Sequence, residues 1–138
     1  MLVATNQQVP SIPPHRGAVT ATEIRRAQGR FRDAIVEFLG QPSSLTFGTM
    51  HREGLEYLEF ERDHLLPSAG RREIDDEQYD QLLEGHFDLV RGVNTIAADT
   101  PGTDELRDDA NRLRHTLLQQ VDLCERTVCR GRSLRLDP

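Results

Sequence analysis

Four segments of the chain repeat apolar residues every three or four positions, the spacing of an amphipathic α-helix. The first segment follows the capping-box pair Thr20 and Glu23 and stops before Gly40 and Pro42, which predicts a helix over 21–39. The four expected apolar stripes are Ile24, Ala27, Phe31, Ala34, Ile35 and Phe38; Phe47, Met50, Leu55, Leu58 and Leu65; Tyr79, Leu82, Leu83, Leu89, Val90, Val93 and Ile96; and Leu106, Ala110, Leu113, Leu117, Val121, Cys124 and Val128.

The second expected helix begins at Ser43 or Ser44 and ends at Leu66, where Pro67 and Gly70 follow. The third follows an Asp75 cap and is broken by Thr100-Pro101-Gly102. The fourth runs from near Thr103 to near Gly131. Short connections between four such helices predict an all-α, up-down-up-down four-helix bundle.

The ends of the chain lack this periodicity. Residues 1–19 contain three prolines and predict a flexible arm, while 132–138 form a C-terminal tail beside the bundle at 20–131. The chain could dock on a protein partner through this arm and this tail. The other association that we consider is a homodimer.

Composition narrows the functional classes. The net charge is −6, and every one of the 17 basic residues is Arg. The absence of Lys excludes a lysine Schiff base and a P-loop lysine, and no long basic stretch predicts nucleic-acid binding. No apolar run approaches the roughly 20 residues of a membrane span, and no secretory signal is evident, so we expect a cytoplasmic protein. No motif predicts a catalytic centre.

The two cysteines, Cys124 and Cys129, are five residues apart on one expected helix. At that spacing the side chains point about 140° apart, too far for a disulfide. We therefore expect free thiols, as a reducing compartment favours.

Several polar residues fall on or near the apolar stripes. His51 lies one heptad before Leu58, and Glu61 lies about 60° from the stripe centre, whereas His64 at about 120° and His115 should face outward. The polar residues expected inside the bundle are Gln28, His51, Glu61, His86, Gln120 and Cys124. Buried polar groups need partners, and bundles with metal centres gather inward ligands in this manner.

Three segments carry a family resemblance: Leu55 to Pro67 (LEYLEFERDHLLP), Gly85-His86-Phe87-Asp88-Leu89, and Leu113 to Glu125. With them the chain resembles the hemerythrin (HHE cation-binding) group of four-helix bundles over about 24–128. The resemblance implies one His from the first helix, His-x-x-x-Glu from the second, one or two His from the third, and His-x-x-x-Glu or Asp from the fourth.

Only part of that ligand set is present. Glu61 and His86 match the second-helix carboxylate and the third-helix His. The other positions hold Gln28, Tyr57, Val90, Gln120 and Cys124, which argues against an oxygen-carrying di-iron centre.

Two functions remain open on these grounds. In the first, His51, Glu61 and His86 hold Fe or Zn, with Gln28, Tyr57, Gln120 and Cys124 lining the same pocket, and the chain senses or binds oxygen or a redox signal. In the second, the histidines and Glu61 are paired core residues, Cys124 is an inert hydrophobe, and the chain is a metal-free regulatory or protein-interaction module. The metal-binding function is the expectation taken forward.

Overall fold

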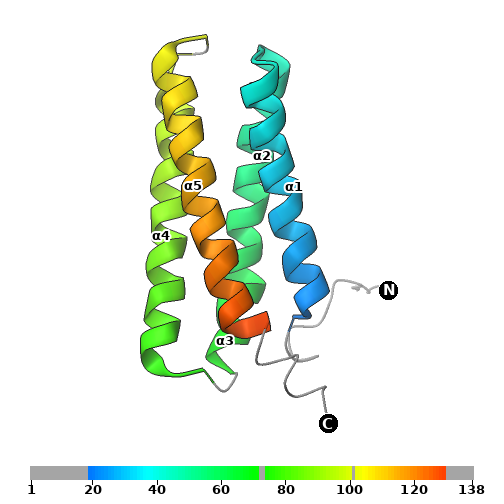
Figure 1. The fold of residues 1–138 in the computed structure, drawn as a ribbon, viewed down its shortest axis with the longest axis vertical. Coiled ribbons are helices and arrows are strands. Elements are labelled where there is room, and N and C mark those ends of the chain that lie inside the picture. Colours follow the sequence, from blue (N-terminus) through cyan, green and yellow to red (C-terminus); the bar gives the residue numbers. More distant parts are fainter. Residues whose placement is uncertain (1–18, 72–73, 101, 130–138) are drawn as a thin grey trace, which may run out of the picture.

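The computed structural model describes residues 19–71, 74–100 and 102–129, and these form an all-helical, up-down-up-down bundle (Figure 1). This fold confirms the prediction. Helix α1 spans Ala21–Gly40, α2 spans Ser44–Phe60, α4 spans Asp76–Ala98 and α5 spans Asp104–Arg126. The expected arm, apart from Val19, and the expected tail lie outside the described residues.

Side-chain caps fix where the long helices begin. The predicted capping box of α1 is present, since the Thr20 side chain accepts from the Glu23 N–H and the Glu23 side chain accepts from the Thr20 N–H. Such caps satisfy N–H groups that have no partner within the helix. The corresponding caps of the other helices are Ser43 with Thr46, Asp75 with Gln78, and Thr103 with the Leu106 N–H.

The second helix does not end at Leu66, as the sequence predicted. It continues through a π-helical turn, η2 (Glu61–Leu65), into α3 (Leu66–Gly70). Proline lacks the N–H that an α-helix needs and its ring clashes with the carbonyl four residues earlier. The wider π turn lies just before Pro67, where the Leu66 N–H bonds to the Glu61 carbonyl five residues back, so the chain passes the proline without breaking.

The fourth helix has an interruption that the sequence did not predict, at Thr127, after which Val128 and Cys129 are helical again. Helix α5 ends at Arg126, with Thr127 outside helical geometry at φ −118° and ψ −84°. The Thr127 hydroxyl donates to the Leu123 carbonyl and so occupies one of the acceptors at this end. A prediction based on apolar spacing misses this interruption because Val128 and Cys129 beyond it are again helical and buried.

The helices pack around two apolar clusters. Neighbouring pairs are α1 with α2, α2 with α4, α4 with α5, and α5 with α1. One cluster centres on Phe31, Met50 and Leu113, and the other on Ile24, Leu65 and Leu82. In the part of the chain that the structure describes, no helix is both long and apolar enough to cross a membrane.

Two carboxyls lie close together where α4 is followed by α5. Asp99 follows α4 directly, and its Oδ2 atom is buried with no hydrogen-bond partner in the described part of the chain. Desolvation, and then the adjacent Asp109, raise the pKa of Asp99, whereas the Arg112 guanidinium holds the pKa of Asp109 below its usual range. Charged Asp99 is therefore less favourable in the folded chain than in the unfolded chain.

The Asp99→Asn variant should raise the melting temperature by about 1–3 °C at about pH 7, because the group is partly exposed and its penalty is screened. A raised folded-state pKa weakens the fold only where the carboxyl is ionised. The gain should therefore vanish as the pH falls to about 3, below the unfolded pKa. Thermal melts across this range test it, with exposed Asp108→Asn as the control; an equal gain in both variants, or a gain independent of pH, contradicts the prediction.

Candidate functional site

A layer of polar side chains separates the two apolar clusters. Each long helical segment contributes one of them: Gln28 from α1, Glu61 from η2, His86 from α4 and Gln120 from α5. They are 3%, 0%, 7% and 2% exposed, respectively. Along each segment, the fully buried apolar residues that precede the polar residue belong to one cluster, and those that follow it belong to the other. The layer is thus built into the core.

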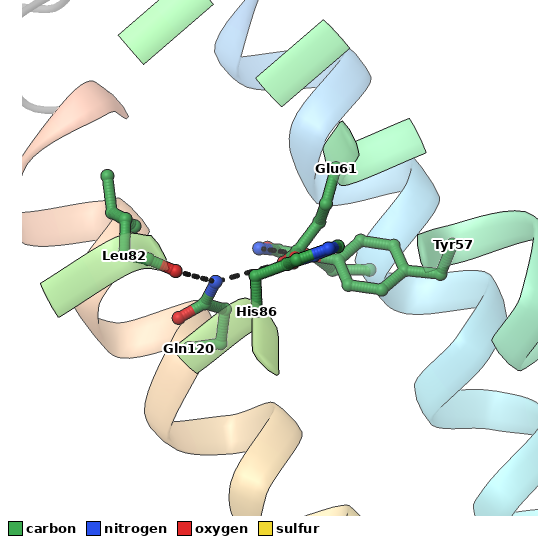
Figure 2. A network of polar contacts seen from close by, with 6 residues as sticks. Tyr57, Glu61, Leu82, His86 and Gln120 are labelled. Atoms are coloured by element: carbon green, nitrogen blue, oxygen red, sulfur yellow. Dashed lines mark hydrogen bonds and ion pairs between the residues drawn. The ribbon is translucent and has the colours of Figure 1, made fainter. Parts of the chain in front are cut away.

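Glu61 is the centre of the layer (Figure 2). Its Oε2 atom accepts from the Tyr57 hydroxyl at 2.5 Å and from Gln120 Nε2 at 3.1 Å. Its Oε1 atom lies 2.8 Å from His86 Nδ1. The ionised form of a carboxylate only accepts hydrogen bonds, and with that form the tautomer that matches this contact carries its proton on Nδ1. Both carboxylate oxygens are therefore hydrogen-bonded by the protein itself.

Tyr57 and Glu61 lie one α-helical turn apart and face the centre of the bundle, and the π turn begins at Glu61. The turn takes up one residue more than an α turn would. Leu65, its last residue, and Leu66 directly after it both pack in the cluster centred on Ile24, Leu65 and Leu82. Sequence reasoning placed Glu61 inside the bundle near the edge of its stripe, and it is completely buried.

Tyr57 connects Glu61 to the first helix. Its hydroxyl donates to Glu61 and accepts from Gln28 Nε2 at 3.1 Å. Burial, and then the negative charge of Glu61, raise the pKa of Tyr57 well above its usual value, so the phenol keeps the proton that it donates. The Gln28 Oε1 atom is buried and has no hydrogen-bond partner among the described residues.

Cys124 lies beside this group and stays protonated. Burial, and then Glu61, raise the pKa of the Cys124 thiol, although a hydrogen bond with Gln28 acts in the opposite direction. A neutral buried thiol behaves as a small hydrophobe with weak hydrogen-bonding capacity. Cys124 and Cys129 are both buried, and neither forms a disulfide within the described residues, which confirms the prediction that they do not pair.

Gln120 depends on a glycine in the neighbouring helix. Its Nε2 atom donates to the Leu82 carbonyl at 3.1 Å as well as to Glu61. A Cβ atom at Gly85 would lie 2.0 Å from Gln120 Oε1, so any other residue at Gly85 would force the amide to move. The close approach of two helices at this glycine carries no signal in apolar spacing, and sequence reasoning missed it.

His51 is not part of this site, contrary to the prediction. It is partly exposed, and its ring stacks on Phe47 with centroids 6.3 Å apart. The buried line of α2 runs through Met50, Gly54 and Tyr57, whereas Leu55 on the predicted stripe is 46% exposed. The stripe was misplaced by about one residue, because a glycine and a tyrosine occupy core positions that apolar spacing assigned elsewhere.

The remaining histidines of the described residues are His64 and His115, and only one of them lies where the sequence predicted. His115 is exposed, as predicted. His64, expected to be largely exposed, is half-buried because its ring packs against Phe60 at a centroid distance of 5.7 Å.

The proposed metal ligands do not converge. Of His51, Glu61 and His86, only the last two are in contact. Within residues 19–71, 74–100 and 102–129, no group of three or more His, Cys, Asp or Glu side chains could hold a metal ion. The donors that do surround Glu61 are a phenol, an imidazole N–H and an amide N–H, which suit a carboxylate and do not fit a di-iron centre.

Comparison with known proteins adds no identification: no family model, curated protein or solved structure matches the chain. The hemerythrin-like resemblance stays a prediction, and the function has to be argued from the polar layer.

Removing the Tyr57 hydroxyl tests the layer. Tyr57→Phe leaves Glu61 without its shortest donor and Gln28 Nε2 without its acceptor, so we expect a loss of about 1–3 kcal/mol in the free energy of unfolding. Urea unfolding followed by circular dichroism measures this loss. Tyr79→Phe, which removes the other tyrosine hydroxyl of the chain, is the matched control. If the two variants lose equal stability, the layer has no special role in holding the fold.

Proposed function

We propose that the chain is a hemerythrin-like bundle that works without a metal, as a regulatory or protein-interaction module. In this proposal the polar layer occupies the place where a hemerythrin-like bundle holds its metal centre. Six of the seven positions that the resemblance assigns to that centre are buried in one region, and the seventh, Val90, is half-buried; the six are Gln28, Tyr57, Glu61, His86, Gln120 and Cys124. Their common location supports a shared scaffold.

The observation that carries the metal-free function is that both oxygens of Glu61 already make hydrogen bonds with buried groups. Tyr57 and Gln120 bond to one carboxylate oxygen and His86 to the other. A metal ion bound to Glu61 would compete with these groups for the carboxylate lone pairs. If it displaced the Tyr57 hydroxyl, that buried donor would lose its acceptor, at a cost of about 1–3 kcal/mol. The layer is therefore arranged to satisfy its carboxylate through hydrogen bonds alone.

Exposed apolar side chains support the interaction part of the proposal. Val36 on α1, Leu45 and Leu55 on α2, and Phe87 on α4 are between 46% and 79% exposed. In this proposal they are the side chains that a partner contacts. A partner chain or a second copy would bury them.

Metal analysis of the purified chain separates this proposal from the alternative, binding of Fe or Zn. After reconstitution with Fe²⁺ and with Zn²⁺, elemental mass spectrometry should find less than about 0.1 ion per chain, and a chelator should leave the melting temperature unchanged. About one ion per chain, lost in a His86→Ala variant and accompanied by a metal-dependent melting temperature, would establish the metal-binding function instead.

Restoring the missing ligands tests the shared scaffold. A variant with Gln28→His, Tyr57→His, Gln120→His and Cys124→Glu recreates most of the ligand set that the resemblance implies. It should bind about two iron ions per chain and gain visible absorption, because its ligands come from facing helices as in di-iron bundles. The control adds Glu61→Gln to the same variant. It removes the carboxylate that matches the family ligand set and should abolish iron binding. A helical, folded variant that binds no iron would overturn the hemerythrin-like scaffold while leaving the metal-free function standing.

A further inference from the structure

A small polar cavity opens between α4 and α5, outside the layer centred on Glu61. It has a volume of about 150 Å³. Its lining comes from two helices: Gln81, Glu84, Gly85 and Asp88 from α4, with Thr116, Gln119, Gln120 and Leu123 from α5. All eight belong to the described residues, and Gln120 also belongs to the polar layer.

The chemistry of the lining is that of hydrogen-bond acceptors. Two carboxylates, Glu84 and Asp88, lie on the α4 side, and none of the eight lining residues is basic. Arg91 pairs with Asp88, whereas no ion pair with Glu84 occurs in the described part of the chain. The Thr116 hydroxyl donates to the Arg112 carbonyl, which leaves its oxygen lone pairs to accept.

The buried wall of the cavity adds a directed acceptor. Gln120 is 2% exposed, and the hydrogen bonds recorded for its side chain among the described residues are both made by Nε2. Figure 2 shows the amide oxygen turned away from Glu61. That oxygen lies against Gly85, where even a Cβ atom would collide with it, and Gly85 itself lines the cavity. The missing side chain at Gly85 gives the cavity its access to the Gln120 amide.

We propose that this cavity binds a small organic cation with several N–H donors, of the amidinium or primary-ammonium class. Glu84 supplies the opposite charge, and the Gln120 and Thr116 oxygens accept N–H groups. A cavity of this volume holds a ligand of about six non-hydrogen atoms, the size of benzene. An anionic ligand would be repelled by the two carboxylates.

Such a ligand would act on the polar layer through one side chain. An N–H donated to Gln120 Oε1 polarises the amide and strengthens the bonds that Nε2 makes to Glu61 and to the Leu82 carbonyl. Binding at the surface would thus tighten the contact of α5 with η2 and α4. This inference does not rest on the metal-free function, because the cavity lies outside the hydrogen bonds of Glu61.

Titration of the full chain with methylguanidinium and with 1,4-diaminobutane, at constant ionic strength, tests the proposal. Binding should be saturable with a dissociation constant of about 0.1–1 mM, as expected for ligands this small in an open site. Two-dimensional NMR should show the Gln120 side-chain NH₂ signals moving together with the backbone amides of residues 81–88 and 116–123. Tetramethylammonium, which has the charge but no N–H donor, should bind at least about tenfold more weakly.

Matched variants locate the site. Glu84→Gln removes the charge from an exposed side chain and should weaken methylguanidinium binding about tenfold. Glu77→Gln removes an equal charge from an exposed position of the same helix outside the cavity and should leave the affinity unchanged. Absence of saturable binding, equal effects of the two variants, or equal affinity for tetramethylammonium would each overturn the proposal. The metal content of the chain has no bearing on any of these outcomes.

Discussion

A carboxylate buried in the middle of a helical bundle is the constraint on which this structure depends. Transferring Glu61 from water into the core is unfavourable unless donors replace the lost hydration. The fold supplies those donors from three different elements, through Tyr57, His86 and Gln120. Other local features of the chain accompany this arrangement: a π turn begins at Glu61, and Gly85 makes room for the Gln120 amide.

The same constraint explains why the core is divided. Apolar side chains above and below the layer exclude water from it, and exclusion strengthens the hydrogen bonds within it. The short contact between Tyr57 and Glu61 depends on this dry setting, in which the phenol keeps its proton. A ligand can change the hydrogen bonds of such a layer only where a member of the layer lines an open cavity. Gln120 does so next to Gly85.

Most of the fold was predictable from the sequence, because caps and apolar spacing are local signals. Thr20, Asp75 and Thr103 begin helices as their types and positions predict. Five of the six polar residues expected inside, all except His51, are buried. The error at His51 arises because apolar spacing gives no weight to Gly54, although this glycine packs against Phe31 of α1 and Val93 of α4 in the core. The π turn was missed because the chain was expected to end its helix before Pro67. The cavity between α4 and α5 could not be predicted, because it depends on two helices meeting at Gly85.

The polar layer also determines how the helices align along their axes. Purely apolar faces can slide past one another at small cost, since one leucine contact replaces another. Here a shift of any one helix by a single turn, about 5.4 Å, would take its polar residue out of the layer and leave Glu61 or its donor facing hydrocarbon. The network thus specifies the register of the helices, because it favours one alignment among several that bury a comparable apolar area.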